Sequence, residues 1–326
     1  MQITQNSSRT YLIETSNKIL KTPFFFPSIS TVRTNYGVYE YFKLIKKVSY
    51  PGFLISSYDI YHNEKRDTLI EEVSKTTEYS AFTLMDSGNY EAYWNNDSMW
   101  NIKNLESILK DISVDFCFSF DVFWKDGKDI DVHVKETITY SAMTAGIQRR
   151  GTTIPLIHSN SLLFPKIVRK VIEGINPQII GIPERELGAS LLERAKTLER
   201  IRYEIDKAER EIPIHLLGTG NPISILIYTL CGADLYDGLE WCKNVVNPET
   251  GHLYHFIQKD LLDCNCKACN TDVPYHLQTM SHNLIFYNNF TKEIRQAIED
   301  EQITEILNKY LPAKVIHKIK KIAGLK

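Results

Sequence analysis

Eight apolar segments of strand length recur along this chain with helical stretches between them, and this alternation constrains the fold most strongly. Strands that alternate with helices form parallel sheets, because each helix provides the crossover to the next strand. Eight such units are the number that closes a barrel, so the sequence predicts an α/β fold of the (β/α)8 TIM-barrel type. The predicted strands cover residues 22–26, 52–55, 81–85, 115–120, 153–157, 178–181, 214–217 and 233–236.

Polar side chains follow several of these strands at the point where each strand ends. Asp86 follows the third strand, Asp121 the fourth and Asp237 the eighth, while His158 follows the fifth. A single Asp after a strand is commonly a helix cap or a turn former. Three at equivalent ends would meet at the mouth of a barrel, where the chemistry of this fold is carried out. The sequence therefore predicts a carboxylate site at this mouth.

A cluster of cysteines after the last predicted strand indicates a metal site. Cys264, Cys266 and Cys269 form a C-x-C-x2-C pattern, which brings three thiolates together on one tight turn. We predict that His282 completes a four-ligand zinc site, with His276 as the competing fourth ligand. Four protein ligands leave no open position, so this zinc is expected to be structural. The alternative is three ordinary half-buried cysteines.

Length and composition exclude some classes of protein. The 326-residue chain is 43% hydrophobic and 24% charged, as in soluble globular proteins, and it has no apolar run long enough to span a membrane. No secretory signal is visible at the start, so we expect a cytoplasmic protein with reduced thiols. Cys117 and Cys231 are expected to be small core residues, and Cys242 is expected to lie near the zinc site. With a net charge of −2, a nucleic-acid partner would need a local basic patch.

Three segments outside the strands are also informative. Residues 188–211 have the spacing of an outer barrel helix, and residues 241–254 carry the turn signals of an inserted hairpin over the site, which includes Lys243. We predict a barrel over residues 1–255, a zinc-binding subdomain over 256–292 and C-terminal helices packed on the barrel over 293–326.

The last nineteen residues, 308–326, contain six lysines and no acid, with apolar residues at helical spacing. This pattern predicts an amphipathic helix with a basic face. The helix either packs with its charges in solvent or contacts a phosphate backbone. The candidate contacts are Lys243, Lys314, Lys318 and Lys321.

Taken in order, these motifs resemble the tRNA-guanine transglycosylase superfamily, whose members exchange guanine for a 7-deazaguanine within a nucleic acid. The resemblance covers most of the chain. The matching segments are DSGNYE at 86–91 for D-S-G-G-[FY]-Q, FDV at 120–122 for F-D-E, IGIPERE at 180–186 for G-G-L-x-V-G-E, LGTG at 217–220 for M-G-x-G, DLYD at 234–237 for D-[LM]-F-D, and HNLIFY at 282–287 for H-N-L-x-F-Y.

The resemblance implies a role for each matching residue. Asp237 would be the nucleophile and Asp86 the second catalytic carboxylate, and Asp121 would read the edge of the base. Tyr90 and Leu217 would hold the base between them. A carboxylate suits this chemistry because breaking an N-glycosidic bond builds positive charge on the sugar.

Other base-binding positions follow the same resemblance. Gly181 and Ile182 would offer backbone groups to the base, and His158 stands where the family has the Gln of Q-G-G. The second glycine of D-S-G-G is Asn89 in this chain, so the pocket wall that selects the base has changed.

Departures from the family bear on the substrate. The arginine-rich T-R-N-G-R loop of the bacterial tRNA enzymes is replaced by LEWCKNVV at 239–246, and no length remains for the extra RNA-binding domain of the archaeal enzymes. These losses favour the branch that inserts 7-cyano-7-deazaguanine into DNA. The alternatives are a tRNA enzyme and a non-catalytic nucleic-acid-binding relative, while a closed four-ligand zinc site argues against a small-molecule zinc hydrolase. The expected partners are the nucleic acid and the free 7-deazaguanine base, with a homodimer or helper proteins left open.

Overall fold

The centre of the protein is a ring of eight parallel strands, which confirms the predicted α/β TIM-barrel fold. A computed structural model describes residues 1–5, 10–15, 17–79, 81–148 and 150–325. The strands pair in the order β8-β7-β6-β5-β4-β11-β10-β9. They are β4 (Phe24–Ile29), β5 (Gly52–Ser56), β6 (Phe82–Asp86), β7 (Phe116–Phe118), β8 (Thr152–Ile154), β9 (Ile180–Pro183), β10 (Ile214–Leu217) and β11 (Leu235–Gly238).

A single parallel bridge between Leu156 and Gly181 closes the ring between β8 and β9. The Gly181 N–H donates to the Pro155 carbonyl and the Gly181 carbonyl accepts from the Ile157 N–H, each at 2.9 Å. A Cβ atom on residue 181 would lie 2.8 Å from a ring carbon of Phe118, so the close approach of the strands requires glycine here.

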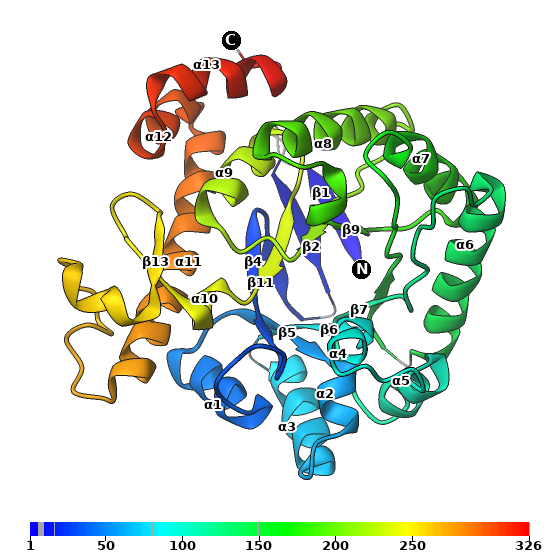
Figure 1. The fold of residues 1–326 in the computed structure, drawn as a ribbon, viewed down its shortest axis with the longest axis horizontal. Coiled ribbons are helices and arrows are strands. Elements are labelled where there is room, and N and C mark those ends of the chain that lie inside the picture. The colour runs from blue at the N-terminus through cyan, green and yellow to red at the C-terminus, as the bar shows by residue number, and fades with distance from the viewer. Residues whose placement is uncertain (6–9, 16, 80, 149, 326) are drawn as a thin grey trace.

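Helices surround the barrel, as Figure 1 shows. α11 contacts α1, α9 and β4, so it occupies the place of the eighth barrel helix. The helices between the strands are α1 (Val38–Val48), α2 (Ser57–Tyr61), α3 (Arg66–Tyr79), α4 (Asn89–Trp94), α5 (Ile102–Leu109), α6 (Ile130–Ile147), α7 (Phe164–Ile175), η1 (Glu184–Leu187), α8 (Leu191–Asp206) and α9 (Pro222–Leu230).

The strands and helices form where the sequence places apolar residues at the matching period. All six residues of β4 are buried, because a barrel strand packs against the interior on one side and the helices on the other. α7 instead buries one stripe, including Ile167, Val168 and Val171, and ends at Asn176 in the left-handed conformation. α8 lies within the stretch predicted as an outer helix, which is confirmed.

A small antiparallel sheet of β1 (Gln2–Gln5), β2 (Tyr11–Glu14) and β3 (Ile19–Lys21) covers the amino-terminal ends of the barrel strands. Lys18 forms an ion pair of 2.7 Å with Asp115, just before β7, and its ammonium donates to the Ala81 carbonyl just before β6. Ile13 and Leu20 are buried in the main core. These three strands were not predicted from the sequence. Because the sheet covers only one end of the barrel, the opposite end stays open for a site.

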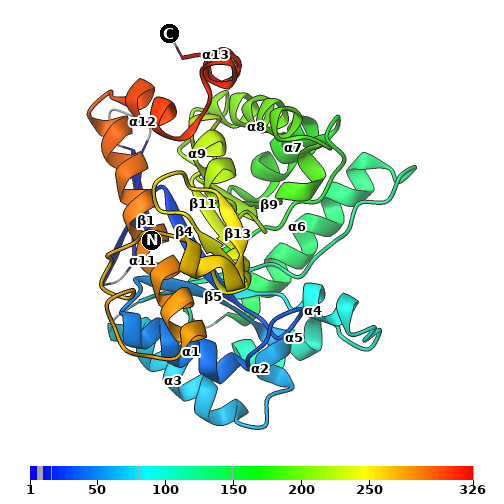
Figure 2. The same ribbon diagram turned by 60° about the vertical axis from the view of Figure 1, so that its left-hand side comes forward.

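The chain after β11 folds into a hairpin, a cysteine-bearing loop, the short helices α10 and η2, and three longer helices, and Figure 2 brings this part of the chain forward. The predicted hairpin is confirmed. The elements are α10 (Glu240–Lys243), β12 (Asn244–Val246), β13 (Leu253–His255), η2 (Phe256–Leu261), α11 (Tyr275–Glu299), α12 (Ile303–Tyr310) and α13 (Ala313–Ile322). The domain boundaries at 255 and 292 stay a prediction, and α11 runs through the second of them without a break.

No helix in the described parts of the chain combines the length and the apolar character needed to cross a membrane.

Candidate active site and metal centre

A cavity of about 710 Å³ opens at the carboxyl ends of the barrel strands. Its lining includes all three carboxylates that the sequence placed there: Asp86 at the end of β6, Asp121 after β7 and Asp237 in β11. A volume of this size is typical of small-molecule sites and accommodates a nucleobase with its sugar. The barrel thus brings together groups that lie far apart in the sequence.

Asp237 is held by donors on both of its oxygen atoms. Its Oδ2 accepts from the Ser28 hydroxyl at 3.0 Å, and its Oδ1 lies 2.9 Å from His215 Nε2 and accepts from the Gly218 N–H at 3.2 Å. The ring of His215 is fully buried next to Phe26 and Phe118. These contacts fix the carboxylate in one orientation. Oδ2 makes one of them and Oδ1 makes two, so Oδ2 has more lone-pair capacity left.

Asp86 has a contrasting environment. Its only hydrogen bond among the described residues is a long one, 3.4 Å, from the Gly88 N–H to Oδ2. Burial raises the pKa of Asp86 well above its ordinary value, and the neighbouring charges of Glu91, Asp121 and Asp237 raise it further. Both effects favour the protonated form of Asp86, which is the form that a general acid needs.

Glu91 is a fourth carboxyl group in the cavity wall, almost completely buried. The hydroxyls of Ser30 and Ser56 donate to its two oxygens at 2.6 and 2.7 Å. Burial raises the pKa of Glu91 to about 7, and the charge of Asp59 adds to this effect. Glu91 can therefore hold a proton close to neutral pH, and the pKa of Asp86 is raised in the same direction.

Asp121 is connected to His158 and Glu186. The Ser87 hydroxyl donates to Asp121 Oδ1 at 2.7 Å, and His158 Nε2 lies 3.7 Å from Asp121 Oδ2. On its other side, His158 Nδ1 lies 2.8 Å from Glu186 Oε1. Burial lowers the pKa of His158, but the two carboxylates outweigh this effect and raise the pKa to about 9. At neutral pH a buried imidazolium thus lies between two carboxylates.

The structure places most of the other predicted base-binding residues at the same cavity. Tyr90, His158 and Leu217 line it, as does Lys243, whose side chain is exposed. The roles assigned to them stay predictions, but their shared location agrees with those roles.

Gly181 and Ile182 are not among the residues that line the cavity. The Gly181 N–H and carbonyl each make a hydrogen bond that closes the barrel. The base-binding roles of Gly181 and Ile182 stay predictions. The residues that directly follow them, Pro183, Glu184 and Arg185, contribute to the wall.

The lysines of α13 lie away from the cavity. Ile316 and Ile319 are buried where α13 packs on α8, and Figure 1 shows α13 outside the ring of helices. Lys314, Lys318 and Lys321 are exposed. Their contact with nucleic acid stays a prediction, and it would require a substrate that extends across α8.

Sequence reasoning missed several groups at the site. His215 lies within a buried strand, where a lone histidine is usually a core residue, and only its alternation with Leu216 indicated that it faces the barrel interior. Glu240 follows Asp237 by three residues, and burial raises its pKa to about 7. Glu186 and Glu91 were within quoted motifs, but their partners Ser30, Ser56 and His158 lie on other strands.

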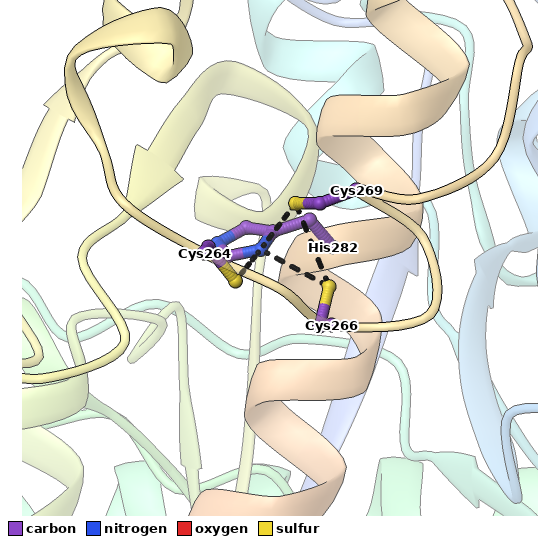
Figure 3. A group of neighbouring side chains, drawn as sticks. All are labelled: Cys264, Cys266, Cys269 and His282. Atoms are coloured by element: carbon purple, nitrogen blue, oxygen red, sulfur yellow. Dashed lines mark hydrogen bonds between the residues drawn. The ribbon is translucent and has the colours of Figure 1, made fainter.

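The four predicted metal ligands form one cluster, drawn in Figure 3. Their ligand atoms lie within 4.8 Å of one another. The distances from His282 Nδ1 to the sulfur atoms of Cys264, Cys266 and Cys269 are 3.4, 3.6 and 3.5 Å, and Cys266 and Cys269 have their sulfurs 3.6 Å apart. A tetrahedral zinc site with ordinary bond lengths separates its ligands by about 3.5 to 3.8 Å. The cluster fits zinc.

The second nitrogen of His282 supports the same assignment. His282 Nε2 lies 2.9 Å from the Val246 carbonyl, so this nitrogen carries the proton and leaves the Nδ1 lone pair for a metal. The competitor His276 is outside the cluster and stacks on Tyr36, with ring centroids 4.8 Å apart. Cys242 is also outside it, with its thiol donating to the Leu239 carbonyl.

The residues next to His282 connect the cluster to the cavity. Asn283 is fully buried; its amide group donates to the Trp241 and Asn244 carbonyls, and its oxygen accepts from the Val246 N–H. One turn further on, the Tyr287 hydroxyl donates to the Gly220 carbonyl at 2.6 Å. The metal cluster thus stabilises the hairpin and α10, which carries Glu240 and Lys243 into the cavity wall.

We expect His282→Ala to lose its zinc, because three thiolates alone leave one corner of the tetrahedron open. His276→Ala should retain one zinc per chain. Loss of the metal should lower the Tm by on the order of 5 °C or more, because the cysteine loop has few other contacts. Elemental analysis and thermal unfolding of both variants measure this. Full zinc in His282→Ala would contradict the assignment.

We expect the stability contributed by His158 to depend on pH in one direction. Its pKa in the folded protein, about 9, lies above the ordinary value of 6.5, so the folded state binds the proton more tightly. The contribution is complete below pH 6.5 and is lost as the pH rises through 9, with an upper limit of about 3 kcal/mol. The free energy of unfolding of the wild type relative to His158→Gln should therefore decrease across this range. Parallel pH profiles for the two proteins would show that His158 is not charged.

Comparisons with known proteins agree with the resemblance seen in the motifs. The chain is 22% identical over 329 residues to the tRNA-guanine(15) transglycosylase of Archaeoglobus fulgidus, a match that covers 92% of this chain and 66% of that protein. It is 20% identical to the same enzyme of Methanopyrus kandleri, covering 90% of this chain and 67% of the relative. For the enzyme of Aeropyrum pernix the identity is 20%, with 90% and 60% covered.

The chain therefore spans about two thirds or less of the length of these relatives. No protein-family model matches it. The relatives named here are tRNA enzymes, and none is named as acting on DNA. Over nine tenths of its length, this chain is similar to the tRNA-guanine transglycosylases.

Proposed function

We propose that the protein is a guanine transglycosylase that exchanges a guanine base in tRNA through a covalent intermediate on Asp237. The observation that carries this proposal is the contrast between two carboxyl groups in one cavity. Asp237 accepts hydrogen bonds on both oxygens, while Asp86 has one long hydrogen bond and a raised pKa. One group is suited to attack a sugar and the other to transfer a proton.

In the first step, Asp237 Oδ2 attacks C1′ of the target nucleotide. The bond between C1′ and the guanine nitrogen breaks, and guanine leaves with the electron pair of that bond. Asp86 gives its proton to the departing base, which becomes neutral guanine. The positive charge that develops on the sugar lies beside the Asp237 carboxylate, whose orientation is fixed by Ser28, His215 and Gly218.

In the second step, an incoming base gives a ring proton to Asp86 and attacks C1′. The bond between C1′ and Asp237 breaks, and the carboxylate is regenerated. Asp86 thus ends the cycle protonated, as it began. The role needs a carboxyl group whose pKa is raised above its ordinary value, and burial and the charges of the other carboxylates act in this direction.

The base is bound between Tyr90 and Leu217, which line the cavity. Asp121 accepts hydrogen bonds from the N–H groups on the edge of the guanine. His158, which lies beside Asp121 Oδ2, keeps this carboxylate in position. His158 Nε2 has no hydrogen-bond partner among the described residues and faces Asp121 at 3.7 Å. His158 is therefore a positioning residue that acts through Asp121.

The zinc site takes no part in these steps. Its four ligands come from the protein, so the metal would stabilise the loop that follows the barrel and has no position left for substrate. The contribution of the metal would be to order this polar segment.

DNA is the second candidate substrate. The wall that follows Asp237 contributes a single lysine, Lys243, and Arg185 is the one arginine in the described cavity lining. The loss of the arginine-rich loop was one of the two features of the sequence that favoured a DNA enzyme. The names of the relatives support tRNA instead, and we place tRNA first.

We expect Asp237→Asn to abolish the covalent complex and to reduce exchange by roughly three orders of magnitude or more, because an amide cannot attack C1′. Asp86→Asn should slow exchange by roughly a hundred-fold and change its pH profile, because it removes proton transfer and retains the nucleophile. Denaturing gels of protein incubated with tRNA or duplex DNA and a base analogue detect the complex.

Asp131→Asn is the matched control, since this exposed carboxylate pairs with Lys170 on the outside of the barrel. It should behave as the wild type. A covalent complex that persists in Asp237→Asn would overturn the assignment of the nucleophile. A complex formed with duplex DNA and not with tRNA would select the second candidate.

A further inference from the structure

The short helix α4 carries an unusual set of exposed aromatic side chains. Tyr90, Tyr93 and Trp94 are 38%, 71% and 39% exposed, although large aromatic residues are normally buried. The opposite side of the helix packs inward through Glu91 and Ala92, which are both buried. The helix is thus held in place by one face and presents its aromatic rings on the other.

An arginine covers one of these rings. The Arg33 guanidinium lies 3.7 Å from the centre of a Trp94 ring, which is a close cation–π contact. The loop of Arg33 is fixed by Asp59, which accepts from the Thr31 N–H at 2.8 Å. Arg33 has no ion pair with a carboxylate in the described parts of the chain, so its charge is available to a ligand.

These aromatic residues are continuous with the cavity. Tyr90, Tyr93 and Trp94 all contribute to its lining, and Phe123, which is 45% exposed, contributes from the loop after β7. The surface therefore runs from the carboxylates outward to the rim without interruption by another element. We call Tyr93, Trp94 and Arg33 the rim platform.

We propose that the rim platform binds an unpaired stretch of nucleic acid, with a base next to the target nucleotide stacked on Trp94 or Tyr93. The proposal rests on the proposed function, because it takes the target nucleotide to enter the cavity. Aromatic rings bind unpaired bases of any sequence by stacking, and Arg33 adds attraction for a neighbouring phosphate. A duplex could not use this surface, since its bases are already stacked on one another.

The charge and position of the platform favour nucleic acid over a protein partner. Arg33 at the rim and Lys243 and Arg185 in the cavity lining are cations around the same opening, although the whole chain has a net charge of −2. A strand that delivers one nucleotide to Asp237 must pass over this rim. The neighbouring nucleotides are therefore the groups that reach Tyr93 and Trp94.

The test is direct binding of a fluorescent stem-loop RNA with an unpaired guanine in its loop, measured by anisotropy. Trp94→Ala and Tyr93→Ala should each weaken binding by roughly ten-fold, while Trp94→Phe should retain most of it. Arg33→Gln should reduce the dependence of the Kd on salt concentration. A DNA stem-loop of the same sequence and a fully paired duplex form the other two arms.

Tyr203→Ala is the matched control. Tyr203 is 59% exposed on α8 and has a cation, Lys207, 4.2 Å from its ring centre, but it does not line the cavity. Tyr203→Ala removes an exposed ring with a cation over it from a place outside the rim platform. The Kd of this variant for the stem-loop RNA should equal that of the wild type.

The outcomes separate this proposal from the proposed function. Unchanged binding in both Trp94→Ala and Tyr93→Ala, or equal affinity for the duplex, would overturn the platform even if the wild type exchanges guanine. Binding that depends on Trp94 in a protein that exchanges no base would support the platform and overturn the proposed function. Equal affinity for the RNA and DNA stem-loops would support stacking and would show that the rim platform does not distinguish ribose from deoxyribose.

Discussion

The pairing of Gly181 with Pro155 and Ile157 closes the barrel, and the candidate site depends on this closure. A side chain at position 181 would collide with Phe118, so the last pair of strands can approach only through glycine. Once the ring is closed, the carboxyl ends of β6, β7 and β11 face a common cavity. Asp86, Asp121 and Asp237 are then close together in a partly buried space, where like charges repel strongly.

Each carboxyl group has different neighbours, and these neighbours offset the repulsion to different extents. Asp237 accepts hydrogen bonds from a hydroxyl and a backbone N–H and lies beside an imidazole, and Asp121 accepts from Ser87 and faces the charged His158. Asp86 lacks such support, and its pKa is raised. Differences in environment thus give carboxyl groups of one cavity different hydrogen-bond partners and different affinities for a proton.

α11 carries the second set of constraints. His282, Asn283 and Tyr287 lie within two turns of this helix, and they contact the metal cluster, the hairpin and the loop after β10 respectively. The helix therefore fixes the hairpin relative to the barrel, and with it the wall formed by Glu240 and Lys243. A metal bound at the Cys264, Cys266, Cys269 and His282 cluster would in this way help to determine the shape of the cavity.

The sequence was most informative where the controlling interactions are local. The eight strands, the hairpin and the C-x-C-x2-C turn could be predicted because periodicity and ligand spacing are properties of short segments. The short strands β1 to β3 were missed because their burial depends on the barrel ends that they cover.

The hydrogen bonds of Gly181 could not be predicted from the sequence for a similar reason. Whether a backbone group is free depends on which strand lies beside it, and that pairing joins segments that no local pattern connects. The partners of Asp237 and His158 come from other strands for the same reason. The choice of DNA over tRNA relied on a replaced loop and on the length left for an extra RNA-binding domain, and the relatives point the other way.

Incorporation of labelled guanine into nucleic acid measures the proposed exchange reaction itself. Purified protein would be incubated with radiolabelled guanine and either bulk tRNA or duplex DNA, and the label in the recovered nucleic acid would be counted. The account predicts label in tRNA, released again when unlabelled base is added, because exchange through a covalent intermediate is reversible. No incorporation into either nucleic acid by zinc-loaded protein would contradict it.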